Sequence, residues 1–424
     1  MARNRNHVLM ILENCNYLRD ARVGKEATAL REAGYDVSVI SPERCKLPSY
    51  LVIDGVVIYG FPHLSFSFGT LGYFIEYAYA TLAIIAITLY VLLTRGFDIL
   101  HVANPPDCIV PVLGIYRILG KRIIYDQHDL SPELYTVRFS SHSASLLRLQ
   151  LWLERWSHKM ADHTIVTNES YRSLALTRGR CSLSRVTVVR NGPDLNRLQG
   201  LSTDMELRKL SPHIIAFAGV TGHQDGLEHL WQSLRVLRFE LGREDFLCII
   251  IGDGEALQDL KRLGAELGIE KNLWFAGWVS DPVVYFRYLT TADICVVPDP
   301  SNCYNDRSTF VKVMEYMMVG KPIVAFDLPE SRFSAGPAAL FVTPNDDREF
   351  ALCLAQLIDD PQLRNSMGQV GRRRIETQLA WLHSIPALLS VYARVAKSED
   401  AAQRNEHAAS GGKLRQSEEK LPES

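Results

Sequence analysis

The sequence has no excess of charge of either sign. Its 46 lysines and arginines stand against 48 aspartates and glutamates, so the formal net charge is -2. A chain with this balance lacks the basic surface that proteins use to bind nucleic acid. Nucleic acid is therefore excluded as an expected partner.

The sequence also lacks the patterns of a metal site. Its eight cysteines are scattered with no pair at metal-ligand spacing, no paired-histidine motif is present, and no Asp-x-Asp follows a predicted strand. We therefore expect no metal ion and no other cofactor. A negatively charged group on a ligand would have to be neutralised by N–H groups and basic side chains.

No secretory signal precedes the first apolar run, "HVLMIL", which begins at His7. Several cysteines, such as Cys248 in "FLCIIIGDG", lie in apolar runs where a free thiol behaves as a small hydrophobic group. Both features favour a reducing compartment, so we expect a cytoplasmic protein.

The 424 residues are too many for one ordinary core. Short apolar strands alternate with helices of ten or more residues, which predicts parallel, doubly wound sheets in an α/β fold. The pattern pauses in a polar linker after "VTVVRNGPDL" and restarts at "HIIAFAGVTG". We predict two Rossmann-like domains that face each other across a cleft, followed by a closing helix and a disordered tail. Their ranges are 1–195, 205–378, 379–396 and 397–424.

A run of 18 residues without charge, 77–94, is bracketed by Glu76 and Arg95. Its length reaches the lower limit for a membrane-spanning helix. A strand and turn of soluble type follow directly, which favours a helix that is buried or faces a membrane. A true span and a two-sided core helix are the alternatives.

Glycine-rich loops follow two predicted strands of the second domain, and ligands bind open α/β sheets at such strand ends. The first loop contains Gly219, Gly222 and Gly226, and the second contains Gly252 and Gly254. Glycine allows close backbone approach, and a helix N-terminus offers free N–H groups to an anion, so the loops favour a phosphate. A plain tight turn is the alternative at each.

A third strand end leads through "SNCYNDRST" into a helix predicted from about Thr309, with Ser308 or Thr309 as its cap. Lys312 and Glu315 are three residues apart and share a face of this otherwise apolar helix. An exposed ion pair is one interpretation, but charges placed beside a ligand explain the pattern better.

The first domain contributes His128, which follows a strand and is flanked by Asp126 and Asp129. A strand-end histidine can donate a hydrogen bond or act as an acid or base, although a lone histidine is often structural. Arg19, Asp20 and Arg22 follow the first strand, where they could touch a second substrate.

The chain resembles glycosyltransferase family 4, retaining sugar transferases with the GT-B fold, and within it a branch of bacterial surface-polysaccharide synthesis. The resemblance covers about 390 residues. It rests on six motifs in order: "YDQHDLSPEL", "VRNGPDL", "GDGE", "FAGWV", "ADICVVPDP" and "MEYMMVGKPIV". It implies a nucleoside-diphosphate sugar held by the C-terminal domain, a glycan or lipid-linked acceptor held mainly by the N-terminal one, and Glu315 on the donor ribose.

This chain departs from the family pattern at three positions. Arg307 stands where relatives usually have a glutamate, and Val220 and Asp225 stand where they commonly have the arginine and lysine that bind the pyrophosphate. If the phosphate site is rewired, Lys312 becomes its main contact. The remaining residues expected at the donor are Gly219, Gly222, Gly252, Gly254, Arg190, Asn191, Arg307, Ser308 and Thr309.

The resemblance also implies a front-face reaction with retention of configuration, in which His128 contacts the transferred sugar or its phosphate. Two alternatives stay open: a catalytically degenerate scaffold subunit and a non-hydrolysing nucleotide-sugar 2-epimerase. If the acceptor is linked to a lipid, the helix at 77–94 would lie against the cytoplasmic face of the inner membrane.

Overall fold

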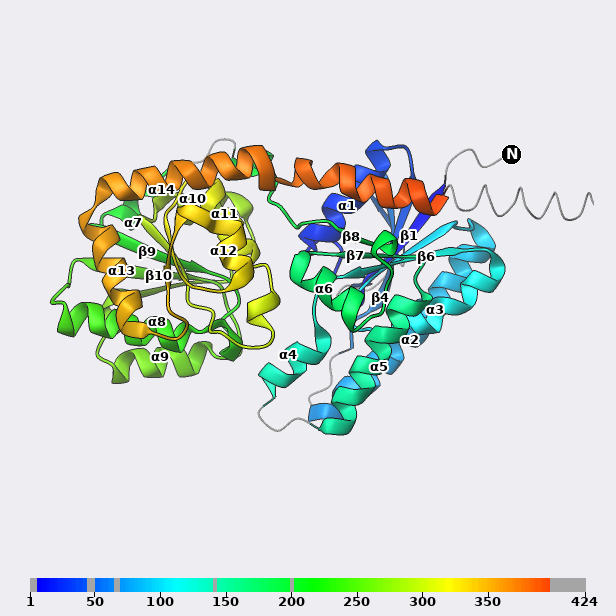
Figure 1. Ribbon diagram of the computed structural model, residues 1–424, viewed down its shortest axis with the longest axis horizontal. Coiled ribbons are helices and arrows are strands. Elements are labelled where there is room, and N and C mark those ends of the chain that lie inside the picture. The colour runs from blue at the N-terminus through cyan, green and yellow to red at the C-terminus, as the bar shows by residue number, and fades with distance from the viewer. Residues whose placement is uncertain (1–5, 44–49, 65–68, 140–142, 199–201, 397–424) are drawn as a thin grey trace, which may run out of the picture.

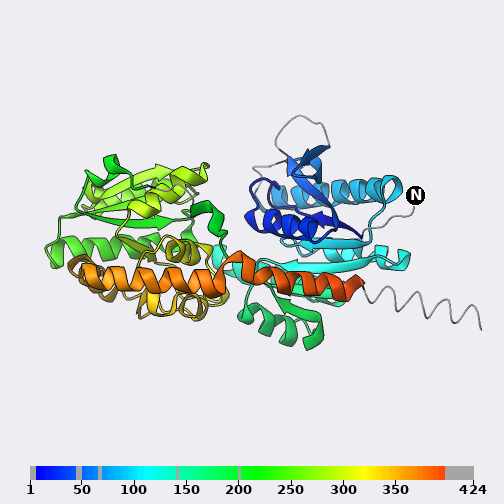
Figure 2. The same ribbon diagram turned by 90° about the horizontal axis from the view of Figure 1, so that it is seen from above.

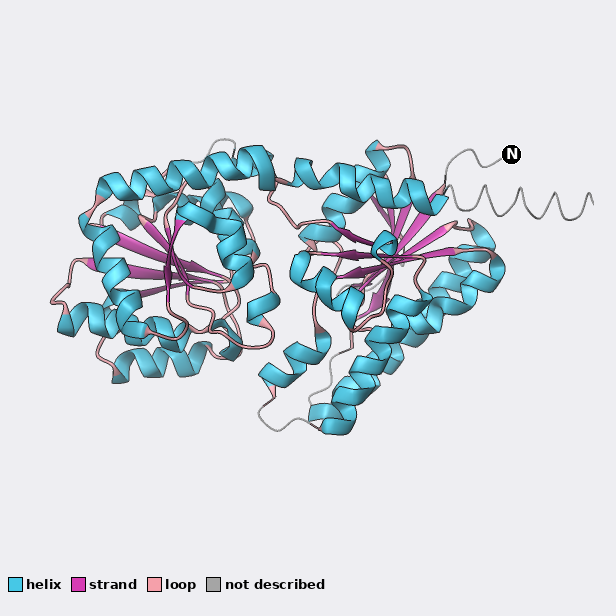
Figure 3. Ribbon diagram, in the orientation of Figure 1, coloured by secondary structure: helices cyan, strands magenta, loops and turns pink. Residues whose placement is uncertain are grey.

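The computed structural model describes residues 6–43, 50–64, 69–139, 143–198 and 202–396. It shows two α/β domains side by side, each with a central sheet covered by helices, and a helical segment that runs from the second domain back to the first (Figure 1). Figure 3 shows the sheets enclosed by helices in both domains. The predicted doubly wound architecture is confirmed.

The N-terminal sheet has the strand order β3-β4-β2-β1-β5-β6-β7-β8. All neighbours are parallel except the edge pair β3 and β4, which is antiparallel. The short β3 is an element that the sequence did not predict. The strands are β1 (His7–Ile11), β2 (Asp36–Glu43), β3 (Leu51–Ile53), β4 (Val56–Pro62), β5 (Ile99–Ala103), β6 (Arg122–Gln127), β7 (His163–Val166) and β8 (Val186–Val188).

The helices of this domain divide between the two faces of the sheet. Alternate residues of β1 show the division: Val8 and Met10 pack with α1, whereas Leu9 and Ile11 pack with α2 and α3. Both faces are therefore buried, as a parallel sheet requires. The helical elements are α1 (Ala21–Glu32), α2 (Gly69–Thr94), α3 (Ile109–Leu113), η1 (Gly114–Leu119), α4 (Ser131–Arg138), α5 (Ala144–Met160), α6 (Glu169–Thr177), η2 (Leu183–Arg185) and η3 (Leu195–Leu198).

The C-terminal sheet is parallel, with the order β11-β10-β9-β12-β13-β14. All six strands lie where the apolar runs predicted them: β9 (His213–Ala218), β10 (Phe246–Ile251), β11 (Leu273–Gly277), β12 (Ile294–Val297), β13 (Ile323–Phe326) and β14 (Ala339–Val342). The principal helices are α7 (Met205–Arg208), α8 (Leu227–Arg235), α9 (Leu257–Glu266), α10 (Pro282–Thr291), α11 (Val311–Met318), α12 (Pro329–Ala335), α13 (Asp347–Asp359) and α14 (Pro361–Arg374). Shorter helical turns complete the domain: η4 (His223–Asp225), η5 (Val236–Glu240), η6 (Glu270–Asn272), η7 (Asn305–Arg307), η8 (Gly336–Ala338) and η9 (Ile375–Leu379).

A helix at 381–396, which we call the crossing helix, follows α14 and η9 and lies on the N-terminal domain (Figures 1 and 2). Its Leu388, Val391 and Tyr392 are part of the same core cluster as Val8. The backbone N–H of Trp381 donates to the carbonyl of Pro193 at 2.9 Å. The chain passes between the domains once after β8 and once before the crossing helix, and this bond joins the two passages. The predicted closing helix is confirmed, and the predicted tail at 397–424 lies outside the described residues.

Helix α2 contains the long uncharged run. By length and composition, two helical stretches among the described residues could cross a membrane, Ile75–Thr94 and Pro361–Ala396. Only 22% of the first is buried, so the alternative of a two-sided core helix is wrong. Ile84 and Val91 pack on the sheet, whereas Leu82 and Leu93 are 67% and 76% exposed.

Candidate active site

His128 lies one residue beyond the end of β6, at the carboxyl edge of the N-terminal sheet. Its Nε2 is 2.6 Å from Oδ2 of Asp126, and its backbone N–H donates to Oδ1 of Asn104, also at 2.6 Å. Burial opposes charging of the ring, but the Asp126 carboxylate outweighs it and raises the pKa of His128. The bond to Asp126 uses Nε2, so Nδ1 is the ring atom that can meet a substrate.

Arg22 corrects one prediction. Its side chain is 4% exposed, its Nε and Nη2 donate to the two carboxylate oxygens of Asp126 at 3.1 and 2.8 Å, and its Nη1 donates to the carbonyl of Val189 at 2.8 Å. A guanidinium buried and bound in this way is not presented to an acceptor. Arg22 instead holds Asp126 as an anion, and burial is outweighed by Arg22 and His128, which keep the pKa of Asp126 well below its usual range.

Glu26 and His101 complete a buried group that we call the His128 cluster. His101 Nε2 lies 3.4 Å from both Glu26 Oε2 and Asp126 Oδ2, and Arg22 Nη2 lies 3.2 Å from Glu26 Oε1. One ligand atom each from Glu26, His101 and Asp126 lies within 4.8 Å of the others, which is close enough for a metal ion. The Arg22 cation already pairs with both carboxylates, so the geometry fits a charge network better than a cation site.

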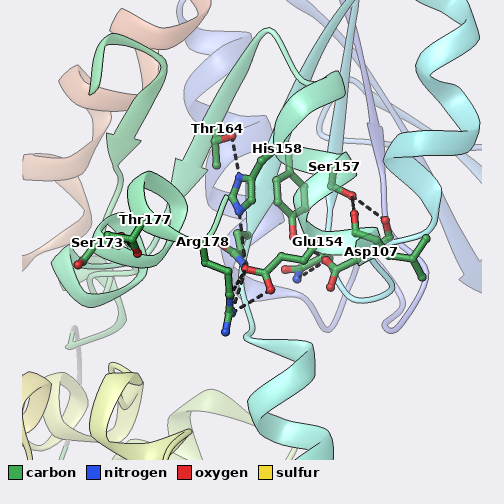
Figure 4. A network of polar contacts seen from close by, with 12 residues as sticks. Asp107, Glu154, Ser157, His158, Thr164, Ser173, Thr177 and Arg178 are labelled. Carbon is green, nitrogen blue, oxygen red and sulfur yellow. Dashed lines mark hydrogen bonds and ion pairs between the residues drawn. The ribbon is translucent and has the colours of Figure 1, made fainter. Parts of the chain in front are cut away.

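A second polar network supports the chain segment that carries His128 (Figure 4). Arg178 bonds both Glu133 of α4 and Glu154 of α5, at 2.5 and 2.8 Å, while Ser157 donates to the carbonyl of Asp107 at 2.7 Å. Figure 4 shows His158 between Thr164 and Glu154. Sequence reasoning missed this network because its members come from five separate segments.

The glycines of the C-terminal domain pack two strand-end loops together. A Cβ on Gly252 would lie 1.8 Å from the carbonyl oxygen of Gly219, and one on Gly254 would lie 2.7 Å from that of Thr221. Gly226 has φ +71° and would place a Cβ 2.0 Å from the Pro298 carbonyl oxygen. Glycine is therefore required for contact between loops, whether or not a ligand is bound.

Lys312 reaches these loops from the first turn of α11. Its Nζ donates to the two carboxylate oxygens of Asp299 at 3.0 and 2.8 Å, and the side chains of the pair are 10% and 1% exposed. The ammonium lies 4.6 Å from the ring centre of Phe217, and a Cβ on Gly219 would be 3.7 Å from it. The cation predicted for the phosphate therefore lies at the first loop, held there by a buried carboxylate.

The carboxylate of Asp225 is hydrogen-bonded to the backbone N–H of Gly222, the group that was expected to bind the donor. The backbone N–H of Gly222 donates to Oδ2 of Asp225 at 3.0 Å, so a phosphate on Gly222 has to displace this carboxylate. Burial raises the pKa of Asp225 to about 6; Lys312 opposes the rise and the charge of Asp299 adds to it. Val220, the other departure, is 52% exposed.

Glu315 lies one helical turn beyond Lys312 and accepts a hydrogen bond from the Tyr285 hydroxyl at 2.7 Å. Burial raises the pKa of Glu315, and the charges of Arg197 and Lys25 oppose that rise. Lys25 belongs to the other domain, where its Nζ donates to Oδ1 of Asn191 at 2.7 Å and to the carbonyl of Gly192 at 2.6 Å. The ribose contact predicted for Glu315 therefore lies close to the crossing between the domains.

The loop before α11 contacts the N-terminal domain. Tyr304 donates to Oδ1 of Asp129 at 2.8 Å, which joins this loop to the residue after His128. The side-chain amide of Asn168 donates to the carbonyl of Arg307 and to Oγ1 of Thr309, at 2.8 and 3.0 Å. The strand-end loops of the two domains are thus in direct contact.

The predicted helix start is wrong by two residues, because α11 begins at Val311 and Phe310 occupies the cap position without a side-chain hydrogen bond. The Ser308 hydroxyl donates to the Tyr304 carbonyl at 2.9 Å instead. Nη1 of Arg190 lies 3.6 Å from Oε2 of Glu330. Its donor contact, and those of Ser308 and Thr309, stay predictions.

The two remaining acceptor predictions fall at the start of α1. Asp20 caps this helix, its Oδ1 accepting from the N–H groups of Arg22 and Val23 at 3.0 and 2.9 Å. Arg19 is exposed directly before it. A capping aspartate keeps one carboxylate oxygen for a ligand, so contact of both residues with an acceptor stays a prediction.

Comparison with known proteins finds a glycosyltransferase family model in each half of the chain. The family model "Glycosyltransferase Family 4" matches residues 22–197, and "Glycosyl transferases group 1" matches residues 212–360. The 2-deoxystreptamine glucosyltransferase of Streptomyces kanamyceticus is 23% identical over 58% of this chain and 64% of its own length. The lipopolysaccharide core biosynthesis glycosyltransferase LpsE of Rhizobium meliloti is 25% identical over 31% of this chain and 37% of its own. The chain thus spans less than two thirds of both relatives.

Two solved structures share the fold. The sucrose-phosphate synthase of Thermosynechococcus elongatus has a TM-score of 0.72 at 16% identity, covering 93% of this chain and 100% of that one. The Anabaena protein HepE in complex with UDP-glucose has a TM-score of 0.64 at 14% identity, covering 93% and 99%. The two family matches cover the two domains separately, and these structures match both domains together. The chain belongs to glycosyltransferase family 4 and has the GT-B fold.

Proposed function

We propose that this protein transfers a sugar from a nucleoside-diphosphate sugar to a glycan or lipid-linked acceptor, with retention of configuration. The observation that carries the proposal is the placement of Lys312. A buried ammonium stands at the Gly219 loop, and Tyr304 joins the loop before its helix to Asp129, next to His128. A cation for the departing phosphate and a histidine for the reacting sugar therefore belong to strand-end segments that this contact between the domains joins.

The reaction follows from these groups. The bond from the sugar's anomeric carbon to the phosphate oxygen breaks while the acceptor oxygen bonds to the same face of that carbon. The acceptor's proton passes to the departing phosphate. Lys312 stabilises the negative charge that grows on the pyrophosphate, and no metal ion is assigned to this task. His128, with Nε2 on Asp126, presents Nδ1 to the sugar or its phosphate.

The domain contacts give this site a way to exclude water. Ser170 donates to Oε1 of Glu330 at 2.6 Å, and Arg138 pairs with Glu255 at 3.0 Å, so the domains touch at further points besides Tyr304 and Asp129. Closed loops limit hydrolysis of the donor, which a transferase must avoid.

We extend the proposal to a lipid-linked acceptor at the cytoplasmic face of a membrane. Leu82, Leu89 and Leu93 form an exposed apolar stripe on α2, and Ile118 of η1 and Trp152 of α5 are 84% and 53% exposed on the same side of the sheet. A surface of this kind is typical of a membrane or partner contact. LpsE, by its name, acts in lipopolysaccharide core synthesis, which supports an acceptor of this class.

Sedimentation with vesicles tests the membrane contact. Wild type should co-sediment with phospholipid vesicles, and a Leu82→Glu/Leu93→Glu variant should stay in solution. Equal recovery of both proteins in the supernatant, with both monodisperse in the absence of detergent, would contradict the contact. It would leave the sugar-transfer proposal intact.

A screen of nucleotide sugars by thermal shift tests the main proposal. A donor at 100 times its dissociation constant stabilises the folded protein by about 2.7 kcal/mol, which is readily measured. No stabilisation by any nucleotide or nucleotide sugar would favour a catalytically degenerate scaffold. Asp225 and Arg307 are the departures from the family pattern that suggest this alternative. Conversion of the donor alone into its 2-epimer, without an acceptor, would favour an epimerase.

A further inference from the structure

Tyr392 of the crossing helix makes a polar contact inside the N-terminal domain. Its side chain is fully buried, its hydroxyl lies 2.5 Å from Nδ1 of His101, and the two rings are stacked with their planes 8° apart. Burial raises the pKa of Tyr392 well above its ordinary value, so the phenol keeps its proton. The two carboxylates near Nε2 of His101 favour the N–H on that nitrogen, which leaves Nδ1 to accept from the phenol. A phenylalanine would fill the same volume, so the hydroxyl is the informative part of this side chain.

The Tyr392 hydroxyl determines which nitrogen of His101 carries the proton. Because Nδ1 accepts from Tyr392, the proton of a neutral His101 resides on Nε2. Nε2 lies 3.4 Å from a carboxylate oxygen of Glu26 and 3.4 Å from Oδ2 of Asp126. The N–H therefore points between two carboxylates. With the other tautomer, Nε2 would face them with a lone pair and repel them.

Asp126 passes this arrangement on to His128, because the Oδ2 atom near His101 is the atom 2.6 Å from Nε2 of His128. The other groups that face His128 are Arg22, Glu26 and Asp20 from α1, and the neighbouring Asp129, which Tyr304 of the other domain holds. These groups come from α1, β5, the β6 end and the opposite domain, and Tyr392 is the contribution of the crossing helix.

We infer that Tyr392 and His101 are positioning residues that act on His128 through Asp126, so the crossing helix completes the catalytic side of the N-terminal domain. The inference deepens the proposed function and rests on it for the role of His128. The crossing helix then does more than connect the two domains. It sets the tautomer of the histidine that supports the reacting one.

The variant Tyr392→Phe tests the inference, since it removes one oxygen atom and keeps the ring. The matched control is Tyr35→Phe, because Tyr35 contacts the Tyr392 ring edge-on at 5.6 Å between ring centres. Without the hydroxyl, the Nε2–H tautomer of His101 loses one of the contacts that favour it, so Asp126 receives this N–H less often and holds a proton on His128 more strongly. We expect the His128 ring to titrate at higher pH in Tyr392→Phe and at the wild-type pH in Tyr35→Phe.

Two readouts separate this inference from the proposed function. Histidine-selective nuclear magnetic resonance of the full chain reports the tautomer of His101 and the titration of His128 without any substrate; signals are assigned with His101→Gln and His128→Asn. With the donor found by the screen, Tyr392→Phe should lower kcat about 10-fold and leave the KM for donor unchanged. A wild-type tautomer and titration in Tyr392→Phe would overturn the inference, whatever the activity. A shifted titration with no donor binding by wild type would uphold the network and reject sugar transfer.

Discussion

The two domains each place a buried cation against carboxylates at the ends of their strands, but the two groups differ in charge balance. In the His128 cluster, Arg22 pairs with both Glu26 and Asp126, and burial raises the pKa of Glu26 to about 7, so Glu26 takes up a proton near neutral pH and leaves Arg22 balanced against Asp126. In the C-terminal domain Lys312 alone faces Asp299 and Asp225, which leaves an excess of one negative charge. The first group is complete as it stands, whereas the second admits an anion only at an electrostatic cost.

This difference explains how a donor site can work with Asp225 in place of a cation. With a pKa of about 6, Asp225 can take up a proton just below neutral pH, which removes the excess charge and weakens its hydrogen bond to the N–H of Gly222. In the N-terminal group, the carboxylate beside His128 has no such freedom, because Arg22 and His128 keep the pKa of Asp126 well below its usual range. Three substitutions test this contrast, from the largest effect to the smallest.

Replacement of His128 should abolish most turnover while sparing the donor site. We expect His128→Asn to lower kcat by about 10² to 10⁴-fold, because the group that contacts the reacting sugar is lost. Thermal stabilisation by the donor should persist, since Lys312 and Glu315 belong to the other domain. His383→Asn, at an exposed position of the crossing helix, is the control. Wild-type turnover in His128→Asn would remove this histidine from the mechanism.

Lys312 could bind the donor phosphate or serve only as the ion-pair partner of Asp299, and two variants distinguish these roles. Lys312→Met leaves Asp299, 1% exposed, without its cation and should destabilise the protein by about 3–5 kcal/mol. The double variant Lys312→Met/Asp299→Asn removes both charges and should recover most of that stability. It should still bind donor about 10- to 150-fold more weakly, as expected for loss of a charged hydrogen bond of about 1.5–3 kcal/mol. If calorimetry gives the double variant wild-type donor affinity, Lys312 is only the partner of Asp299.

The pH dependence of donor binding should depend on Asp225. Its folded pKa of about 6 lies above the ordinary value of about 3.9, so its contribution to stability is complete below pH of about 4 and is lost as the pH rises through 6. Donor affinity should follow the same direction, increasing several-fold from pH 7.5 to 5.5. A nucleotide sugar has no phosphate group that titrates in this interval, so the change reports the protein. Asp299, Lys312 and Glu228 are the other charges facing Asp225.

The control for this experiment is Asp225→Asn, which should bind donor with nearly constant affinity across the interval. A wild-type affinity that is flat, or that falls toward low pH, would mean that Asp225 does not oppose the phosphate. The contrast between the two charge groups would then have no functional consequence.

The sequence predicted most strands because buried parallel strands are continuous apolar runs, and runs such as "FLCIII" and "HIIAFA" have no competing interpretation. It also identified Lys312 and His128, since a charge at a strand end or on an apolar helix stands out. Arg22 shows the limit. From sequence it resembles any exposed basic residue near a strand end, and only the approach of Asp126, over a hundred positions later, shows that it is buried.

By itself, the sequence determined the order of strands and helices and the division into two α/β halves, because these depend on local periodicity. The tertiary structure decided which charges meet. Pairs such as Lys312 with Asp299, Asp126 with Arg22 and His101 with Tyr392 join segments that only the packing of helices on the sheets brings together. Electrostatic energy depends on distances of a few ångström and on burial, and neither can be read from the sequence alone.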